Sequence, residues 1–159
     1  MQSQNNPEAG PGFRANVGIM VVNQKHLILA GQAFYYPGEW LMPQGGIDPS
    51  ERPTSAMQRE LEEETGLSLD QMRLIHELED WQYYLFKKPQ YKDDIFYKGQ
   101  RQKWFLLEYN GPLPDTAPKH LQEFTHFDWV EPDWLIQNTA TFLADVYRKV
   151  IEGFKLHLP

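Results

Sequence analysis

The sequence predicts an α/β protein in which a mixed β-sheet lies between helices. Three observations support this prediction. A β-branched, apolar run at residues 17–22 has the composition of a buried strand, residues 53–65 have the signals of a central helix, and residues 140–154 have those of a terminal one. Strand-like segments before and after the central helix are typical of a sheet covered by helices.

The first elements are a tail and a hairpin. Residues 1–12 are rich in Gln, Asn, Pro and Gly, so we expect a flexible tail, followed by one domain over residues 13–159. The strand at residues 17–22 should turn at residues 23–25 and pair back through residues 26–30.

An aromatic loop and a helix come next. Residues 35–40 form the loop, and residues 40–43 form a short strand that leads into a Gly-Gly pair. The helix should begin near Pro53, because proline suits a first helical turn, and end at Thr65 with Gly66 as its C-terminal cap.

The second half continues with strands and closes with a helix. Residues 87–103 are predicted to be a polar, basic excursion and residues 112–120 a proline-interrupted loop. The final helix should pack one stripe against the core, made of Phe142, Val146 and Val150. The expected strands are residues 72–78, 81–86, 104–109 and 127–130.

Composition excludes several classes of function. The chain has 159 residues and no cysteine, so disulfides and thiolate chemistry are absent. We find no membrane-spanning run and no signal peptide, which predicts a cytoplasmic protein with no membrane partner. A net charge of -7 argues against broad non-specific binding to nucleic acid, and we expect no DNA partner, but the charge permits a polyphosphate substrate if metal ions supply the local positive charge.

A cluster of glutamates lies late in the central helix. At about 100° per residue, Glu60, Glu63 and Glu64 share one arc, and Glu62 points to solvent. Like charges at these spacings repel, and acids near a helix C-terminus oppose its dipole. A bound divalent cation would remove both penalties, although a solvated acidic face has the same spacing.

The surrounding residues resemble a known family. Gly45 precedes Glu51 by six residues, Glu51 precedes Arg59 by eight, and Arg59 opens an Arg-Glu-Leu-x-Glu-Glu-x-Gly-Leu run that ends at Leu67. This pattern matches the signature of the Nudix hydrolases. The segments at residues 14–18, 40–46, 99–105, 123–124 and 145–150 are similar to bacterial RNA pyrophosphohydrolases. The resemblance implies an α/β/α sandwich with the motif as a loop-helix-loop.

The resemblance also implies a metal site that binds two or more Mg²⁺ or Mn²⁺ ions. Glu123 would complete the site from a loop, unless it is a plain surface residue. Gly45 and Gly46 would bring the backbone close to metals and phosphates, a role compatible with a simple tight turn. The expected ligands from the helix are Glu60, Glu63 and Glu64, whose oxygens suit hard cations.

Two further roles follow from the motif. Glu51 and Arg59 are expected to form an ion pair that holds the loop against the helix. Glu60 is the candidate general base, because a carboxylate at the metal site can sit beside the attacking water. A glutamate from a loop is the alternative base.

The substrate side is assigned by the same resemblance. Arg14 and Phe142 match an arginine and an aromatic residue that contact the 5′-terminal bases of RNA. From its spacing alone, Phe142 equally fits core packing beside Val146. Gln44 and Lys103 lie in two of the similar segments and are expected to contact substrate as well.

Two positions depart from the RNA pyrophosphohydrolase pattern. Leu143 stands where those enzymes often carry a lysine. The loop at residues 31–38 lacks their arginines and has Phe34, Tyr35 and Tyr36 instead. Binding of RNA would then rest on the basic residues Lys87, Lys88, Lys92, Lys98, Arg101 and Lys103.

The expected function is therefore metal-dependent removal of pyrophosphate from the 5′-triphosphate end of RNA, which promotes mRNA decay. The alternatives are hydrolysis of dinucleoside polyphosphates or free nucleoside triphosphates, and a non-catalytic nucleotide or RNA sensor. Isomerase chemistry on the same fold usually relies on a cysteine, which this chain lacks. The oligomeric state is left open.

Overall fold

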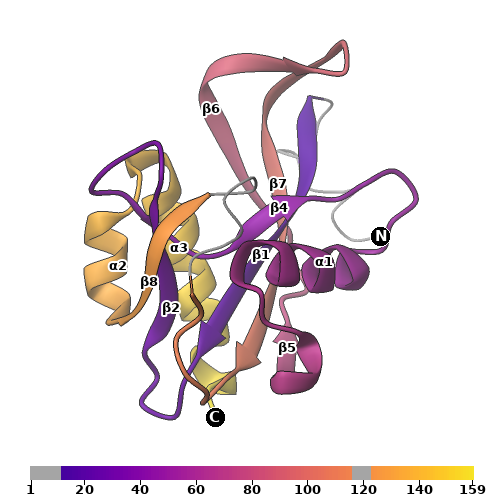
Figure 1. Cartoon of the computed structure of the whole chain (residues 1–159). Helices are drawn as coiled ribbons and strands as arrows, with labels where there is room; N and C mark the ends of the chain where they lie inside the picture. The colour runs from indigo at the N-terminus through magenta and orange to yellow at the C-terminus, as the bar shows by residue number, and fades with distance from the viewer. Residues whose placement is uncertain (1–11, 116–122) are drawn as a thin grey trace.

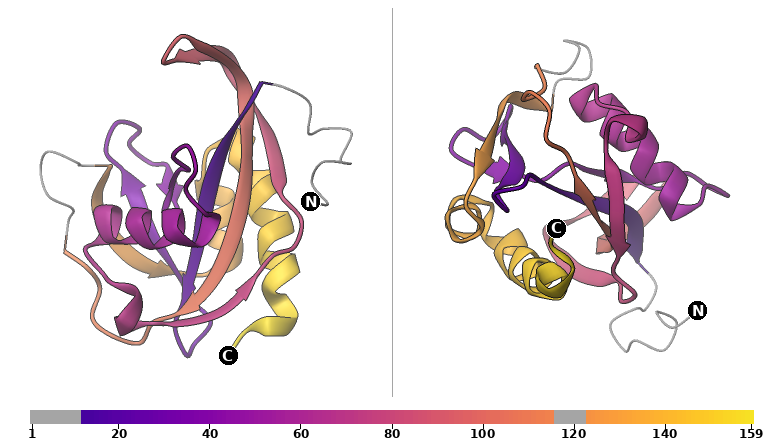
Figure 2. Two further views of the ribbon diagram at one scale, coloured as in Figure 1. Left: turned by 90° about the vertical axis from the view of Figure 1, so that its right-hand side faces the viewer. Right: turned by 90° about the horizontal axis from the view of Figure 1, so that it is seen from below.

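A mixed β-sheet of eight strands runs through the molecule, with helices on both of its faces (Figures 1 and 2). The structure is a computed structural model that describes residues 12–115 and 123–159. The main strand order is β3-β2-β1-β7-β5, with β4 added to β1, β6 to β7 and β8 to β2. The predicted mixed sheet between helices is confirmed.

The strands have the following bounds: β1 Phe13–Val22, β2 Ile28–Ala33, β3 Trp40–Leu41, β4 Gln44–Gly46, β5 Arg73–Glu77, β6 Gln82–Lys92, β7 Ile95–Glu108 and β8 Phe124–Val130. The helices are α1 Pro53–Thr65, α2 Pro132–Asn138 and α3 Thr141–Phe154, with two short 3-10 turns, η2 Leu69–Gln71 and η4 Lys155–His157.

The centre of the sheet is a parallel pair, β1 and β7. Their register runs without interruption from Phe13 opposite Gly99 to Val22 opposite Glu108. The other strand pairs are antiparallel. This pairing explains why β1 begins earlier than the apolar run at residues 17–22: residues 13–16 also pair with β7, although the sequence there lacks an apolar run.

Each face of the sheet has its own core. Helix α1 covers one face, where Met57 and Leu61 are fully buried against residues that include Phe105. Helix α3 covers the other, where Tyr147 packs against Trp104 with ring centroids 5.8 Å apart. The hydroxyl of Tyr147 also accepts a hydrogen bond of 2.9 Å from the backbone N–H of Met42. This bond ties α3 to the segment that enters β4.

Three sequence predictions need correction. Residues 87–103 are not an excursion from the fold, because most of them belong to the paired strands β6 and β7. Phe142 is not in the core stripe of α3: it is 40% exposed, and Leu143 is buried instead. The short helix α2 was not anticipated.

The tail predicted at residues 1–12 lies outside the described residues except for Gly12, and so does most of the loop at residues 112–120. Within the part of the chain that the structure describes, no helix is long and apolar enough to cross a membrane.

Candidate functional site

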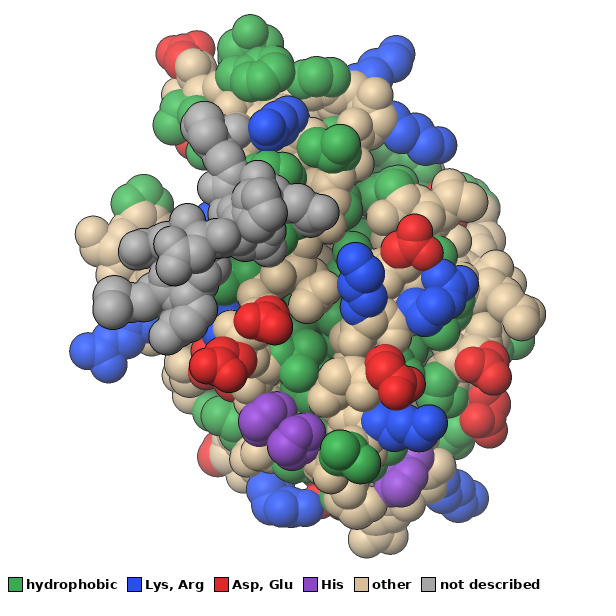
Figure 3. All heavy atoms as spheres, turned by 180° about the vertical axis from the view of Figure 1, so that it is seen from behind, with side chains coloured by type: hydrophobic (Ala, Val, Ile, Leu, Met, Phe, Trp, Pro, Cys, Tyr) green, Lys and Arg blue, Asp and Glu red, His purple; other side chains and the backbone are tan. Residues whose placement is uncertain are grey.

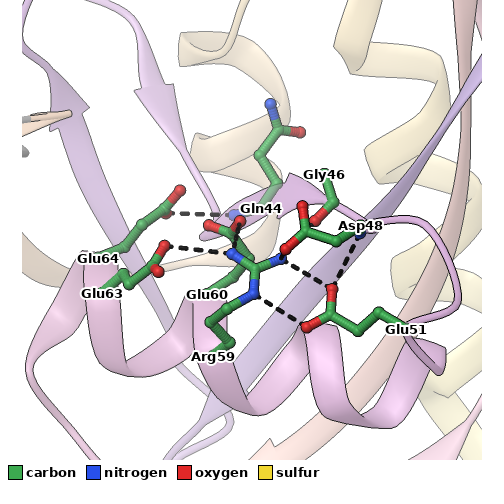
Figure 4. Close-up of polar contacts among 8 residues, drawn as sticks. All are labelled: Gln44, Gly46, Asp48, Glu51, Arg59, Glu60, Glu63 and Glu64. Atoms are coloured by element: carbon green, nitrogen blue, oxygen red, sulfur yellow. Dashed lines mark hydrogen bonds and ion pairs between the residues drawn. The ribbon is translucent and has the colours of Figure 1, made fainter.

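Helix α1 places the glutamate cluster. Pro53 occupies its first turn, and Gly66 ends it in the left-handed conformation with φ 74°, donating its N–H to the carbonyl of Glu62. Because the apolar side of α1 is fixed against the sheet, the carboxylates turn toward β4 (Figure 4). Glu64 is buried, with 7% of its surface exposed, whereas Glu62 faces solvent.

The glycines of β4 make room for these carboxylates. Strand β4 pairs with β1, with Val17 opposite Gly45. A Cβ atom on Gly45 would lie 1.8 Å from Cδ of Glu60, and one on Gly46 would lie 2.4 Å from Nη2 of Arg14. Neither glycine has a positive φ. The absence of a side chain at both positions therefore makes room for the ends of Glu60 and Arg14, and the backbone conformation does not itself demand glycine.

Arg59 lies at the centre of the hydrogen bonds around the cluster (Figure 4). Its Nε and Nη2 donate to the two carboxylate oxygens of Glu51, each at 3.0 Å, and Nη2 also donates to the carbonyl of Gly46 at 2.8 Å. Its Nη1 donates to Glu60 at 2.8 Å and to Glu63 at 3.3 Å. Arg59 thus links the loop after β4 to the helix. The Arg59 guanidinium lowers the pKa of Glu51.

The charges of the cluster are incompletely neutralised. Burial raises the pKa of Glu60, although Arg59 opposes this shift. Burial, followed by the charge of Glu60, raises the pKa of Glu64 well above its ordinary value, and Glu123 and Glu63 add to the effect. Glu64 receives one compensating hydrogen bond, of 3.2 Å, from the backbone N–H of Gln44.

This arrangement fits a divalent cation by the chemistry of its donors. The oxygens are carboxylates, which hard cations prefer, and the raised pKa values show that positive charge would stabilise the cluster. Among the described residues, no three acidic or histidine side chains converge as a ready metal site, and Arg59 holds one oxygen each of Glu60 and Glu63.

Glu123 lies close enough to the cluster for its charge to act on Glu64. It immediately precedes β8, its side chain is exposed, and its charge contributes to the raised pKa of Glu64. Its carbonyl accepts a hydrogen bond of 2.8 Å from the N–H of Phe34. The loop between β2 and β3 therefore lies beside it, and there Tyr35 and Tyr36 are exposed.

Arg14 and Phe142 lie on the side of the site formed by β1, β7 and α3. Arg14 is opposite Gln100 in the sheet, and its guanidinium reaches Gly46. The ring of Phe142 lies 5.5 Å from that of Tyr84, which pairs with Gln100 from β6. Tyr84 has no sequence signal, because it belongs to a segment without a motif, and Gln100 lies in the similar segment at residues 99–105 but was given no role.

Gln44 and Lys103 are placed differently. The side chain of Gln44 accepts a hydrogen bond of 2.8 Å from the buried amide of Gln102, so it belongs to a network within the sheet. Lys103 is not brought to the cluster. Its ammonium donates to the carbonyl of Glu79 at 2.7 Å and lies 5.9 Å from the ring of Trp81.

Comparison with known proteins identifies the family. The family model described as the NUDIX domain matches residues 12–153. Nudix hydrolase 26, chloroplastic, of Arabidopsis thaliana is 36% identical over 158 residues, which cover 92% of this chain and 71% of that protein. A protein of Cereibacter sphaeroides named RNA pyrophosphohydrolase is 36% identical over 152 residues, covering 92% of this chain and 93% of its own length.

A solved structure has the same fold. The Ap4A hydrolase of C. elegans, crystallised as a binary complex, superposes with a TM-score of 0.61 at 21% identity, covering 88% of this chain and 98% of that one. Members of the family generally use divalent metal ions such as Mg²⁺. The match to the family model and the two relatives, over most of the described residues, show that this chain belongs to the Nudix hydrolases.

Proposed function

We propose that this protein is a metal-dependent RNA pyrophosphohydrolase, which removes pyrophosphate from the 5′-triphosphate end of RNA and leaves a 5′-monophosphate. The observation that carries the proposal is that the carboxylate cluster and Arg14 both lie against strand β4. The carboxylate cluster lies against Gly45 on one side, and Arg14 contacts Gly46 on the other. A phosphate chain and a 5′-terminal base could therefore be bound side by side.

The metal site would be formed by Glu60, Glu63 and Glu64, completed by Glu123, with the backbone of Gly45 and Gly46 alongside. We propose two or more ions, Mg²⁺ or Mn²⁺. When bound, such ions supply neutralisation of the phosphate charge and a lower pKa for coordinated water. Glu63 and Glu60 would then exchange their hydrogen bonds with Arg59 for these contacts.

Glu60 is the proposed general base. The backbone at Gly45 lies against its carboxylate and restricts its orientation, and this restriction does not depend on the hydrogen bond from Arg59 to Oε1. A carboxylate at the metal site lies within reach of the attacking water, which is the geometric condition for a general base. Glu51 would act on the same group indirectly, because it fixes the guanidinium of Arg59 with two hydrogen bonds.

Arg14 and Phe142 are the proposed contacts for the 5′-terminal bases. The exposed ring of Phe142 offers a surface for stacking, and the guanidinium of Arg14 lies between that side and the glycines. The names of relatives such as the protein from Cereibacter sphaeroides favour RNA as the substrate. The rates measured on RNA would then depend on both residues.

A second candidate is a hydrolase of dinucleoside polyphosphates. The observation that favours it is the aromatic loop beside Glu123, where Tyr35 is 73% and Tyr36 is 64% exposed. These rings could stack on a second nucleoside at the opposite end of a polyphosphate chain.

The experiment that separates the candidates compares three substrates in Mg²⁺ or Mn²⁺: 5′-triphosphorylated RNA, a dinucleoside tetraphosphate and free nucleoside triphosphates. Each is followed for its leaving group. The proposal expects the highest kcat/KM for the RNA, with a 5′-monophosphate end as product. A higher kcat/KM for the dinucleoside tetraphosphate would replace it with the second candidate.

A further inference from the structure

The strands β6 and β7 extend beyond the body of the protein as a two-stranded ribbon (Figure 1). Strand β1 accompanies β7 only from Gly99 onward, and the N–H of Lys98 donates to the carbonyl of Gly12 just before β1 begins, so residues 95–97 pair with β6 alone. The ribbon turns at Asp93 and Asp94, which have φ 51° and 63°, as hairpin turns with two left-handed residues require. A ribbon of two strands is only marginally stable by itself. Its projection from the body of the protein therefore suggests a function for its surface.

The surface of this ribbon is apolar and basic. Its exposed apolar side chains include Tyr91, 74% exposed, and Phe96, 46% exposed, whose rings form an edge-to-face pair with centroids 5.5 Å apart. At the top of the molecule in Figure 3, apolar and basic side chains are interleaved. The exposed lysines of the ribbon are Lys87, Lys88, Lys92 and Lys98, against two aspartates, in a chain whose net charge is -7.

The ribbon continues the face that carries the base-binding residues. Tyr91 and Phe96 are opposite each other in the register of β6 and β7, so their side chains share one face. Side chains alternate along a strand, which places Phe96 on the same face as Gln100. Gln100 is in turn opposite Arg14 in β1. The aromatic pair and Arg14 therefore lie along one face of the sheet.

Phe142 joins this face from α3. It contacts Tyr84, which is opposite Gln100 in the register of β6 and β7. The path from Gln100 to Phe96 is four residues of β7, on the order of 13 Å, which corresponds to about four stacked bases at ~3.4 Å each. A single strand whose first bases lie at Arg14 and Phe142 would reach the aromatic pair a few nucleotides later.

We propose that the β6–β7 ribbon binds the single-stranded RNA chain downstream of its 5′ end. The inference rests on the proposed function and adds a second contact region for the same substrate. Tyr91 and Phe96 stack on bases, because aromatic faces accept any base, and the four lysines contact phosphates. A surface that gathers lysines beside exposed aromatic rings suits a polyanion with bases that can stack.

The test uses two substrates with the same 5′ sequence, a 5′-triphosphorylated dinucleotide and an oligoribonucleotide of about 12 nucleotides. The full-length protein should have the higher kcat/KM on the longer RNA. The variant with Tyr91→Ser and Phe96→Ser should lose at least about 10-fold in kcat/KM on the longer RNA, since the loss of stacking on even one base has about that effect. Its rate on the dinucleotide should stay unchanged, which also shows that the fold is intact.

A second variant, with Lys87→Gln, Lys88→Gln and Lys92→Gln, tests the binding of phosphates by the ribbon. Binding of the longer RNA with a 5′-hydroxyl, which cannot be hydrolysed, is measured by fluorescence anisotropy over a range of salt concentrations. The slope of log K against log salt should decrease by about 0.7 for each phosphate that the variant no longer binds. Matched controls are Leu156→Ser, at a side chain that is 94% exposed on η4, and Lys25→Gln in the turn after β1.

The outcomes separate this inference from the proposed function. Equal kcat/KM for both RNA lengths, or ribbon variants that behave like the controls, would overturn the inference while RNA hydrolysis stands. Ribbon variants that lower activity on both substrates and convert a dimer to a monomer would assign the ribbon to self-association instead. If no RNA is hydrolysed but the ribbon variants weaken binding of the 5′-hydroxyl RNA, the inference stands and the proposed function fails.

Discussion

Replacement of Gly45 by alanine should lower the catalytic rate but leave the stability of the fold almost unchanged. The new Cβ atom would lie 1.8 Å from Cδ of Glu60, and distances below 3.0 Å from a Cβ atom essentially do not occur. The carboxylate must therefore retreat by at least 1.2 Å, the difference between 3.0 and 1.8 Å. It can do so by rotation, because it is the end of a flexible side chain.

A displacement of about 1 Å in a catalytic group reduces the rate by about 100-fold, or ~2.7 kcal/mol in the activation free energy. We expect kcat of Gly45→Ala on 5′-triphosphorylated RNA to fall by this factor at saturating Mg²⁺. The melting temperature should change little, since the φ of Gly45 is not positive and an alanine suits the backbone. Both quantities are measured on the same preparation, kcat by pyrophosphate release and stability by thermal unfolding.

Gly66→Ala is the matched control. At Gly66 a Cβ atom meets nothing within 4 Å, but φ is 74°, which strains an alanine. This variant should be less stable by about 1 kcal/mol and retain its kcat below the unfolding transition. A Gly45→Ala enzyme with normal kcat, or one that loses kcat only in proportion to its loss of stability, would refute the argument from the proximity of Glu60.

Four other substitutions have distinct expected outcomes. Glu60→Gln should lower kcat by at least about 100-fold, measured in Mg²⁺, and near-normal turnover would remove Glu60 as the base. Glu64→Gln should abolish activity but raise the melting temperature of the metal-free protein near neutral pH. The reason is that the raised pKa of Glu64 reflects a penalty on its ionised form in the folded state. The difference in melting temperature between the variant and the unchanged protein should vanish as the pH falls from above the raised pKa of Glu64 toward the pKa of an unfolded glutamate. A difference that grows as the pH falls would contradict the explanation. Tyr147→Phe leaves the N–H of Met42 without its hydrogen bond and should destabilise the fold by about 1–3 kcal/mol in chemical denaturation, with normal kcat in native conditions. Phe142→Ala should raise KM for RNA and leave turnover of free nucleoside triphosphates intact, because the ring is 40% exposed; global unfolding of this variant would restore the core-packing interpretation.

The sequence was most informative where local signals decide the structure. The helix from Pro53 to Thr65 has the predicted bounds, because a proline at its start and a glycine at its end act within one turn. Its apolar residues also determine the side of the helix on which the glutamates lie. The positions of Glu60 and Glu64 against β4 therefore follow from the motif and from the absence of a side chain at Gly45.

The sequence was least informative where partners far along the chain decide the structure. Residues 87–98 alternate poorly between apolar and polar side chains, so the sequence predicts no strand there, yet residues 90–92 pair with residues 95–97 beyond a register shift between Leu85 and Gln90. On the last helix, Phe142 and Leu143 are adjacent and both apolar. Only the packing of α3 on the sheet decides that Leu143 is buried and that Phe142 remains half-exposed beside Tyr84.

The pairing of β4 with β1 bears on how the active site responds to its substrate. Gly45 and Gly46 are part of a hydrogen-bonded ladder on a central strand, so their backbone is held as firmly as the core of the sheet. A closing motion of β4 toward a bound phosphate chain would have to break that ladder. Side chains rather than the backbone therefore adapt to a phosphate chain. Arg59 can replace its hydrogen bonds to Glu60 and Glu63 by bonds to other oxygens while its hydrogen bonds to Glu51 remain.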